Sequence, residues 1–381
     1  MHVLHVSPYF PPTWAYGGIP RIVHGLTRAL SEQGVECSVW TTDACDAARA
    51  RVPRDRVHDG VRVLTSMNWS NTLAYQHQLF VPRDVPLDIL DDVDLVHLHG
   101  HRHLLNNAAV AFAGRRSIPY VMTPNGTLRR HERKVGAKLV WDLLFSGRLP
   151  GGARKLIAVS RSEAGRFVQD GFRPERIATI PNGLMLDEFE DLPEKGLFRE
   201  RWGVEGRIVA YLGQVSPRKG VEHLVEAFQT GISDATLVVG GNDMGGMNTA
   251  RERASSSVVF TGLLEGPERL ALLVDADVLV YPSTDEVFGL VPFEGLMCGT
   301  PVVVGGDCGC GELISQAGAG LLVRHADVEG LRERIRTLLD DTAAANAMAT
   351  RGRDYVTERL SFATVARQHA ALYDEVVSSA R

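Results

Sequence analysis

The feature that most constrains this chain is an alternation of short apolar runs, rich in Val, Ile and Leu, with amphipathic stretches. Such runs are typical of buried parallel strands, and the stretches between them are typical of crossover helices. We therefore expect an α/β fold. The first half predicts strands at Val3 to Val6, Glu36 to Thr41, Asp94 to His99, Tyr120 to Thr123, Lys155 to Val159 and Ile177 to Ile180, and a helix at Pro20 to Gln33.

A turn signal in the middle of the chain separates two stretches of this alternation. Pro181-Asn182-Gly183 is followed by a charged stretch to Arg201. Because 381 residues are too many for one core of ordinary size, we place a domain at 1–185 and a second at 186–360. The second predicts strands at Ile208 to Leu212, Ala235 to Val239, Val258 to Phe260, Val278 to Tyr281, Pro301 to Val304 and Gly320 to Val323, a helix at Val221 to Gln229, and two closing helices at Val328 to Leu339 and Ser361 to Ser379.

Composition narrows the class of partner. With 44% hydrophobic and 23% charged residues the chain is a globular protein, and its net charge of −5 argues against a general nucleic-acid binder. The five cysteines form no CxxC pair, which favours a reduced cytoplasm. The N-terminus enters a strand without a signal-peptide pattern, and no run approaches the roughly 18 apolar residues of a membrane span. We therefore expect neither secretion nor membrane insertion.

Ligands of open parallel sheets bind beyond the carboxyl ends of the strands, so the loops there are the places to search. The first such loop carries Gly17 and Gly18 in front of a helix. Glycines let backbone N–H groups approach a phosphate, and the helix N-terminus attracts anions. The same loop also fits a flexible turn.

Histidines cluster near the end of the strand Asp94 to His99. A histidine at a strand tip that faces a crevice can bind a sugar hydroxyl, whereas one inside a strand is more often a satisfied core residue. We therefore assign a functional role to His99 and a structural one to His97 and His103.

Adjacent cations, Arg218 and Lys219, precede the helix at Val221. Arginine can bind two oxygens at once and lysine acts as a point charge, so this loop tip suits a diphosphate. The alternative is a solvated surface pair.

An acid pair, Glu286 and Glu294, spans a strand end and the first turn of a short helix that opens near Gly289. Backbone N–H groups of Leu290 and Val291 can meet a phosphate there, and each carboxylate can accept two hydroxyl hydrogen bonds from a diol. We expect both carboxylates to face the same crevice.

These motifs, in this order, resemble the retaining family 4 glycosyltransferases, whose GT-B fold has two Rossmann-like domains with parallel sheets facing across a crevice. The resemblance covers nearly the whole chain. It rests on Gly17-Gly18 with Arg21, Leu98-His99-Gly100, Thr123-Pro124-Asn125-Gly126, Ala158-Val159-Ser160, Pro181-Asn182-Gly183, Pro217-Arg218-Lys219-Gly220, and the pair Glu286 and Glu294.

The resemblance implies a donor site for a nucleoside diphosphate sugar, most often of UDP or GDP. Gly18, beside Gly17, would face the diphosphate and Lys219, with Arg218, would neutralise it. Backbone groups around Gly289, namely those of Leu290 and Val291, would donate hydrogen bonds.

The same resemblance assigns the sugar contacts and the mechanism. Glu294 would hold the ribose, Glu286 would bind hydroxyls of the transferred hexose, and His99 would contact the sugar near the bond being formed. Configuration would be retained by front-face attack, in which the leaving phosphate deprotonates the acceptor. Neither a metal nor another cofactor would be required.

Two positions depart from the family pattern, and both concern the site. Gln214 stands where the family usually has arginine, which shifts diphosphate binding toward Arg218. Asn125 stands where histidine is common; we place it, with Arg129, on the acceptor side. The resemblance also implies that helix 361–381 packs back on the first domain.

The sequence leaves three classes of acceptor open: a carbohydrate, a lipid-linked molecule or a small molecule. A basic cluster in the first domain suits an anionic or membrane-borne acceptor through weak peripheral contact, although a solvated face is the favoured interpretation. Its residues are Arg129, Arg130, His131, Arg133, Lys134 and Lys138.

Three other functions compete with this one. A metal-dependent transferase would use an Asp-x-Asp motif, but Asp92-Val93-Asp94 and Asp275-Ala276-Asp277 precede strands, at the wrong end of a sheet. A nicotinamide or flavin enzyme would need a GxGxxG fingerprint, and the loop from Gly240 to Gly246 has the wrong spacing. A protein that binds a nucleotide sugar without transferring it is the remaining alternative.

Overall fold

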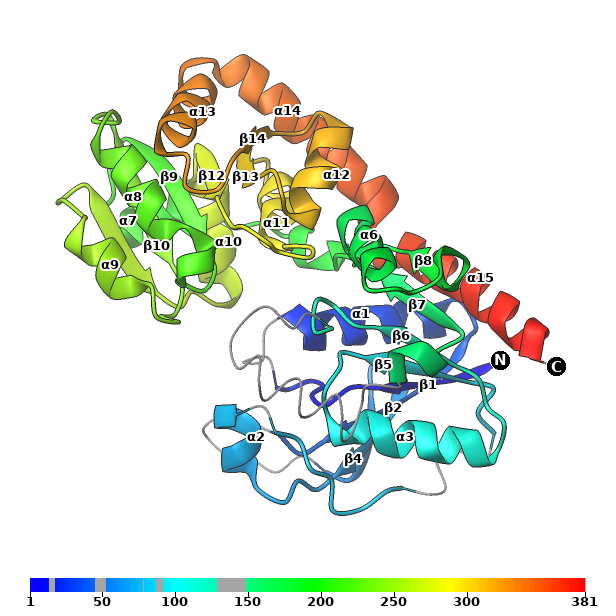
Figure 1. The fold of residues 1–381 in the computed structure, drawn as a ribbon. Coiled ribbons are helices and arrows are strands. Elements are labelled where there is room, and N and C mark those ends of the chain that lie inside the picture. The colour runs from blue at the N-terminus through cyan, green and yellow to red at the C-terminus, as the bar shows by residue number, and fades with distance from the viewer. Residues whose placement is uncertain (14–17, 45–52, 78, 87–91, 129–148, 381) are drawn as a thin grey trace. The chain divides into compact units, whose positions relative to one another are not determined.

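The computed structural model describes residues 1–13, 18–44, 53–77, 79–86, 92–128 and 149–380 (Figure 1). The chain divides into two compact units. Unit 1 comprises Met1–Gly183 and Phe362–Arg381, and unit 2 comprises Leu184–Ser361. The sequence predicted the divisions after residue 185 and after residue 360, close to these positions.

Unit 1 is built on one sheet, in which eight strands are described, in the order β3-β4-β2-β1-β5-β6-β7-β8. The strands predicted in this half are confirmed. All described pairs are parallel except β3 with β4. The bounds are β1 His2–Val6, β2 Glu36–Thr42, β3 Asp55–His58, β4 Val61–Ser66, β5 Leu95–His99, β6 Tyr120–Thr123, β7 Lys155–Ala158 and β8 Ile177–Thr179.

The hairpin of β3 and β4 was not predicted from the sequence. β3 reads Asp-Arg-Val-His, and none of its residues is fully buried, so it lacks the apolar run by which the other strands were found. The turn that joins it to β4 is Asp59-Gly60, and both residues have positive φ, 47° and 79°. Asp-Gly between two strands is a strong hairpin signal, so the turn could have identified the pair.

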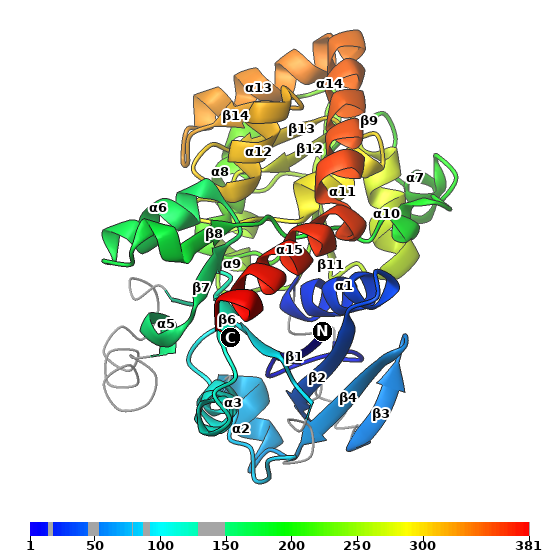
Figure 2. The ribbon, with the colours of Figure 1, turned by 90° about the vertical axis from the view of Figure 1, so that its right-hand side faces the viewer.

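The described helices of unit 1 include α15, which returns from the end of the chain. Figure 2 shows α15 beside α1. Phe362 of α15 lies where a side chain at Gly25 or Gly183 would stand, and Gln33 Nε2 donates to the Ala363 carbonyl at 2.8 Å. The bounds are α1 Gly18–Glu32, α2 Asn71–His77, α3 Leu104–Arg115, α5 Leu149–Gly152, α6 Arg161–Gln169 and α15 Phe362–Ala380.

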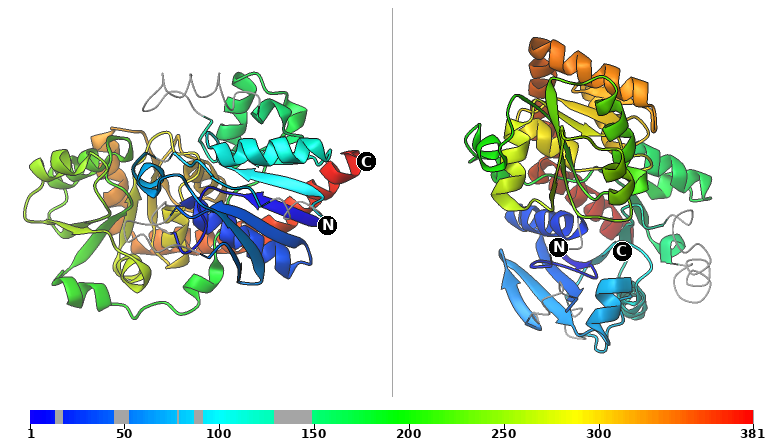
Figure 3. Two further views of the ribbon diagram at one scale, coloured as in Figure 1. Left: turned by 90° about the horizontal axis from the view of Figure 1, so that it is seen from below. Right: turned by 90° about the vertical axis from the view of Figure 1, so that its left-hand side faces the viewer.

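Unit 2 is a parallel sheet in the order β11-β10-β9-β12-β13-β14, with helices on both faces (Figure 3). Its predicted strands are confirmed. The strands are β9 Arg207–Leu212, β10 Ala235–Gly240, β11 Val258–Gly262, β12 Val278–Tyr281, β13 Val302–Gly305 and β14 Leu321–Val323. The helices are α7 Leu197–Trp202, α8 Val221–Gln229, α9 Met247–Glu252, α10 Gly266–Asp275, α11 Val291–Met297, α12 Gly309–Ala317, α13 Val328–Asp340 and α14 Thr342–Tyr355.

The prediction of two closing helices was incomplete, because α14 stands between α13 and α15. Asp341 caps α14 by accepting a hydrogen bond from Ala344 N at 3.0 Å. The helix is rich in alanine and lacks an apolar period, which explains why the pattern missed it. In the described parts of the chain, no helix combines the length and apolar character that a membrane crossing needs.

We expect Gly25→Ala to lower the free energy of unfolding by about 1 to 3 kcal/mol, because its new methyl group would overlap the Phe362 ring. Gly165→Ala is the matched control. This glycine lies exposed inside α6, and a Cβ added there would meet no atom within 4 Å. The substitution should raise the free energy of unfolding by up to about 1 kcal/mol. Urea unfolding measures both. Equal changes would contradict the packing of α15 on α1.

Candidate functional site

In each sheet the chain first adds strands on one side of a central strand and later adds them on its other side. The central strand and its neighbour across this change mark one place in the sheet. In unit 2, β10 and β11 lie on one side of β9, whereas β12, β13 and β14 lie on the other. β9 and β12 are parallel neighbours, so their carboxyl ends meet at one edge. The loops that follow them diverge, which is the usual setting of a ligand site.

Lys219, which follows β9, is buried, so the alternative of a solvated surface pair does not hold for it. Its ammonium group donates to Tyr281 Oη at 2.6 Å and forms an ion pair with Glu286, which follows β12. Gly220 makes this loop possible: it has φ of 65°, and a Cβ there would lie 3.0 Å from the Pro282 carbonyl oxygen. The structure thus brings two predicted site residues into direct contact.

Charge in this cluster is set by burial and by the pairing. Burial works to raise the pKa of Glu286, but the charge and hydrogen bond of Lys219 outweigh it and hold that pKa below its ordinary value. Burial raises the pKa of Tyr281 well above its ordinary value. At neutral pH the cluster is therefore an ion pair beside a neutral phenol. Tyr281 was not predicted as a site residue, although its place at a strand end is a signal for one.

Glu294 has a different partner from Glu286. It is buried in α11, and its Oε2 lies 2.5 Å from Nη1 of Arg269 in α10. Arg269 also binds Glu188 at 2.8 Å. Sequence reasoning missed this arginine, since no local motif marks a partner that arrives from another helix.

The loop side chains predicted to hold the diphosphate lie near the Lys219 cluster in sequence. Gln214 is exposed, and its carbonyl oxygen accepts a hydrogen bond from Tyr211 Oη at 2.7 Å. Arg218 is half-buried, and its carbonyl oxygen accepts from Thr284 N at 3.0 Å, which ties the loop after β9 to the loop after β12.

Helix α11 begins at Val291, two residues after Gly289, as the sequence predicted. Gly289 has φ of 85°, and a Cβ there would lie 3.1 Å from Cys310 Sγ. The backbone N–H groups of Leu290 and Val291 stand at the start of the helix, where no preceding helical turn supplies acceptors.

His99, in unit 1, also lies at a reversal of strand order, because β1 and β5 are neighbours from which the chain continues in opposite directions. Expected at an open strand tip, it is 1% exposed, and its Nε2 lies 3.0 Å from His5 Nδ1. His97 has the structural role assigned to it, since its two nitrogens bind Tyr373 Oη and Thr123 Oγ1 at 2.7 Å each. His5 was not predicted.

A buried thiol near His5 bears on which nitrogen of His99 carries hydrogen. Burial raises the pKa of Cys37 to about 12, so the thiol keeps its proton, and its sulfur lies 3.9 Å from His5 Nε2. If the thiol donates there, His5 Nδ1–H donates to His99 Nε2, and the hydrogen of His99 stands on Nδ1. Among the described residues this Nδ1 makes no hydrogen bond.

Several predicted motifs meet beside His99 in unit 1. His99, Thr123, Asn182 and His369 line a small cavity, with room for about one water molecule. Asn182 Nδ2 donates to Asn125 Oδ1 at 3.2 Å.

A further carboxylate, Glu163, ties the strand ends around this region together. It accepts from Gly126 N at 2.7 Å and from Val159 N at 2.8 Å, and Ser160 caps its helix. Ser160 and Glu163 have the spacing of a capping box, a signal that could have found this buried carboxylate.

Some predicted positions lie outside the described residues. These are Gly17, Arg129 and the rest of the basic cluster up to Lys138. Gly18 is described as the first residue of α1.

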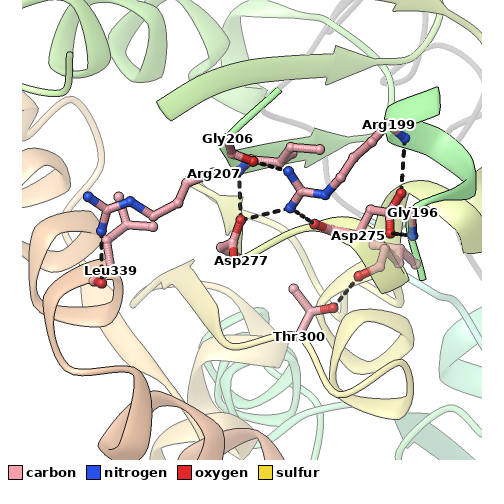
Figure 4. A network of polar contacts seen from close by, with 10 residues as sticks. Gly196, Arg199, Gly206, Arg207, Asp275, Asp277, Thr300 and Leu339 are labelled. Atoms are coloured by element: carbon pink, nitrogen blue, oxygen red, sulfur yellow. Dashed lines mark hydrogen bonds and ion pairs between the residues drawn. The ribbon is translucent and has the colours of Figure 1, made fainter. Parts of the chain in front are cut away.

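The aspartates of the rival Asp-x-Asp motif hold the amino end of β12 in place (Figure 4). Asp275 accepts hydrogen bonds from the backbone N–H groups of Gly196 and Arg199. Asp277 accepts from Ile208 N at 2.8 Å and from the Arg199 guanidinium at 3.1 Å. Both carboxylates thus lie at the end of β12 opposite to Glu286, as strand-entry residues.

Comparison with known proteins decides the family. Residues 16–188 match the model described as Glycosyltransferase Family 4, and residues 194–355 match the one described as Glycosyl transferases group 1. The chain belongs to the family 4 glycosyltransferases. This glycosyltransferase is 29% identical to a glycogen synthase from Mycobacterium tuberculosis, and the alignment covers 98% of this chain and 94% of that protein.

Solved structures place the two units in the GT-B fold. Sucrose-phosphate synthase from Thermosynechococcus elongatus has a TM-score of 0.77 at 22% identity, with 99% of each chain covered. HepE from Anabaena, solved with UDP-glucose, has a TM-score of 0.73 at 20% identity, with 98% of this chain and 100% of that one covered.

Acid should destabilise this glycosyltransferase through its buried histidines. Burial lowers the pKa of His5 to about 3 and those of His103 and His369 to about 4, whereas unfolded histidines titrate near 6.5. The unfolded state therefore binds more protons as pH falls below about 6.5, and the free energy of unfolding decreases. We expect His369→Gln to reduce the slope by about 1 kcal/mol per pH unit between about pH 6 and pH 5. Urea unfolding at several pH values measures it, and an unchanged slope would count against a neutral buried His369.

Replacing Arg269 should lower the free energy of unfolding more than replacing its partner Glu188. We expect Arg269→Met to lower the free energy of unfolding by about 3 kcal/mol or more, because Glu294 then stays buried without its cation. Glu188→Gln should cost about 1 kcal/mol or less, since Glu188 is one-third exposed. Chemical unfolding compares the two variants, and equal losses would show that the Glu294 pair is not special.

Proposed function

We propose that this glycosyltransferase is retaining and metal-independent, and that it moves a hexose-type sugar from a UDP or GDP sugar to an acceptor hydroxyl. The observation that best supports the proposal is the largely buried ion pair of Lys219 and Glu286 where β9 and β12 meet. A donor of this kind carries a diphosphate, which suits the lysine, and sugar hydroxyls, which suit the carboxylate.

Donor binding exchanges the partners within this cluster. Without donor, each charge of the Lys219–Glu286 pair neutralises the other and keeps both side chains in place. The diphosphate then takes Lys219, whose contact with Tyr281 Oη can persist. Glu286 is left to accept hydrogen bonds from sugar hydroxyls. A nucleoside diphosphate without its sugar would leave the carboxylate buried and unpaired, which is costly, so the site prefers the complete donor.

The reaction proceeds on one face of the sugar. The acceptor oxygen attacks C1 from the side of the leaving group, the bond from C1 to the β-phosphate oxygen breaks, and the acceptor proton passes to the leaving phosphate. Negative charge grows on the β-phosphate, where Lys219, Arg218 and the N–H groups of Leu290 and Val291 stabilise it. The phosphate itself serves as the base.

His99 contributes a hydrogen-bond donor in unit 1. In the arrangement in which Cys37 donates to His5 and His5 donates to His99, the hydrogen of His99 stands on Nδ1 and is donated to a hydroxyl of the transferred sugar. Glu294, paired with Arg269, accepts from the ribose hydroxyls.

Two alternative functions predict different experimental results. A metal-dependent enzyme would need free carboxylates at a carboxyl strand end, whereas Asp275 and Asp277 bind backbone groups at the other end. A protein that only binds nucleotide sugars would show affinity without turnover.

The test measures affinity for UDP, GDP and ADP sugars and for the matching nucleoside diphosphates, by thermal shift and calorimetry. We expect one base to be preferred, and the complete donor to bind more tightly than its diphosphate. Glu286→Gln should remove most of that preference, whereas Lys219→Met should weaken binding of both ligands about tenfold to a hundredfold. The double variant, in which no charge is left unpaired, checks folding, and Lys195→Met, at an exposed position, is the control.

Turnover, measured well below the Tm, distinguishes the remaining outcomes. NMR of the product should show the anomeric configuration of the donor, and a chelator should leave the rate unchanged. An inverted product would contradict retention, loss of rate with chelator would favour the metal-dependent enzyme, and binding without hydrolysis or transfer would favour the binding protein.

A further inference from the structure

Two imidazoles and a carboxylate meet on unit 1 away from the sugar-binding histidine. His24 lies in the middle of α1, His58 is the last residue of β3, and Asp59 opens the turn to β4. One ligating atom of each lies within 4.8 Å of those of the other two. His24 Nε2 is already 2.8 Å from Asp59 Oδ2.

The backbone fixes two of these residues. His58 pairs with Val61 in the antiparallel ladder, and the two residues between them, Asp59 and Gly60, have φ of 47° and 79°. Positive φ at both central positions defines the tight hairpin turn that matches the twist of the strands. His58 and Asp59 are therefore held side by side by a rigid turn.

The imidazoles have a common wall. Phe10 packs edge-on against His24 and against His58, with ring centroids 5.9 Å apart in both cases, and the two imidazoles are 5.0 Å apart. His24 is buried whereas the side chain of Asp59 is 50% exposed. The cluster is thus closed on the Phe10 side and open to solvent at the carboxylate.

Nearby cations have partners of their own. Arg56 donates to the Pro11 carbonyl oxygen at 2.7 Å and to Thr65 Oγ1 at 2.9 Å. Arg28 pairs with Glu32 at 3.0 Å. Each guanidinium group is thus held by acceptors outside the cluster.

We propose that His24, His58 and Asp59 bind a divalent transition-metal ion, with Zn²⁺ as the best match. Two histidine nitrogens and one carboxylate oxygen are ligands that Zn²⁺ accepts at about 2.0 to 2.2 Å, and water completes a four-coordinate site on the exposed side. The ion joins α1 to the β3–β4 hairpin. Its role is structural, and it does not take part in sugar transfer.

The other cluster with suitable spacing in the described residues is the buried trio His5, His97 and His99. It offers no carboxylate to balance a divalent charge, and both nitrogens of His97, with His5 Nδ1 and His99 Nε2, already have partners. Burying an uncompensated dication is costly, so the site at the hairpin is favoured.

The test is a titration of chelator-treated full-length protein with Zn²⁺, and with Co²⁺ for its visible spectrum. We expect one equivalent bound at micromolar concentration and a rise in Tm of about 5 °C at saturation. Asp59→Asn is the sharpest variant, because asparagine also adopts positive φ and keeps the turn. It should weaken binding at least about tenfold, as should His58→Gln, with turnover unchanged.

Two controls decide the location of the ion. His223→Gln alters a surface histidine beside Glu222 in unit 2 and should leave the titration unchanged. His5→Gln alters the buried trio. The proposal is overturned if the wild type binds no zinc, if Asp59→Asn and His58→Gln bind as the wild type does, or if only His5→Gln loses the ion. Because turnover is measured separately, failure here is distinct from failure of the proposed transfer mechanism.

Discussion

The rest of this structure depends on one constraint of parallel sheets: two neighbouring strands whose crossover connections run in opposite directions leave their carboxyl ends uncovered. Unit 2 has this arrangement at β9 and β12, and unit 1 has it at β1 and β5. Lys219 and Glu286 meet at the first, and His5 and His99 meet in the second pair of strands. Hydrogen-bonded strands bring together side chains that are far apart in the sequence.

Buried charge is the second organising principle. Lys219 with Glu286, and Arg269 with Glu294, are ion pairs largely withdrawn from water, and pairs of this kind seldom add net stability. Their value lies in holding ionised groups ready in a fixed position. The cost is borne by the extensive apolar packing of the sheet, whose central strands β9 and β12 are almost fully buried.

Local patterns were enough to predict much of the fold and part of the site. Apolar runs located the strands that are buried in each sheet, and glycines and charged residues beyond them located Lys219 and Glu286. The same reasoning failed where a group acts through a distant partner. Arg269 has no motif of its own, and His99 was expected at an open tip because the sequence does not show that His5 stands beside it. Asp59-Gly60 and Ser160 with Glu163 were readable signals, of a turn and of a cap, that no apolar run accompanied.

The return of α15 has a consequence for the order in which the protein can fold during synthesis. Unit 2 is one continuous segment, Leu184–Ser361, and can fold as soon as it leaves the ribosome. Unit 1 begins earlier and ends later, since Phe362 and Tyr373 reach back to Gly25 and His97. Its apolar surface under α15 therefore stays open while the whole of unit 2 is being made. Unit 1, whose sheet is translated before unit 2, therefore completes its core only after α15 has been made.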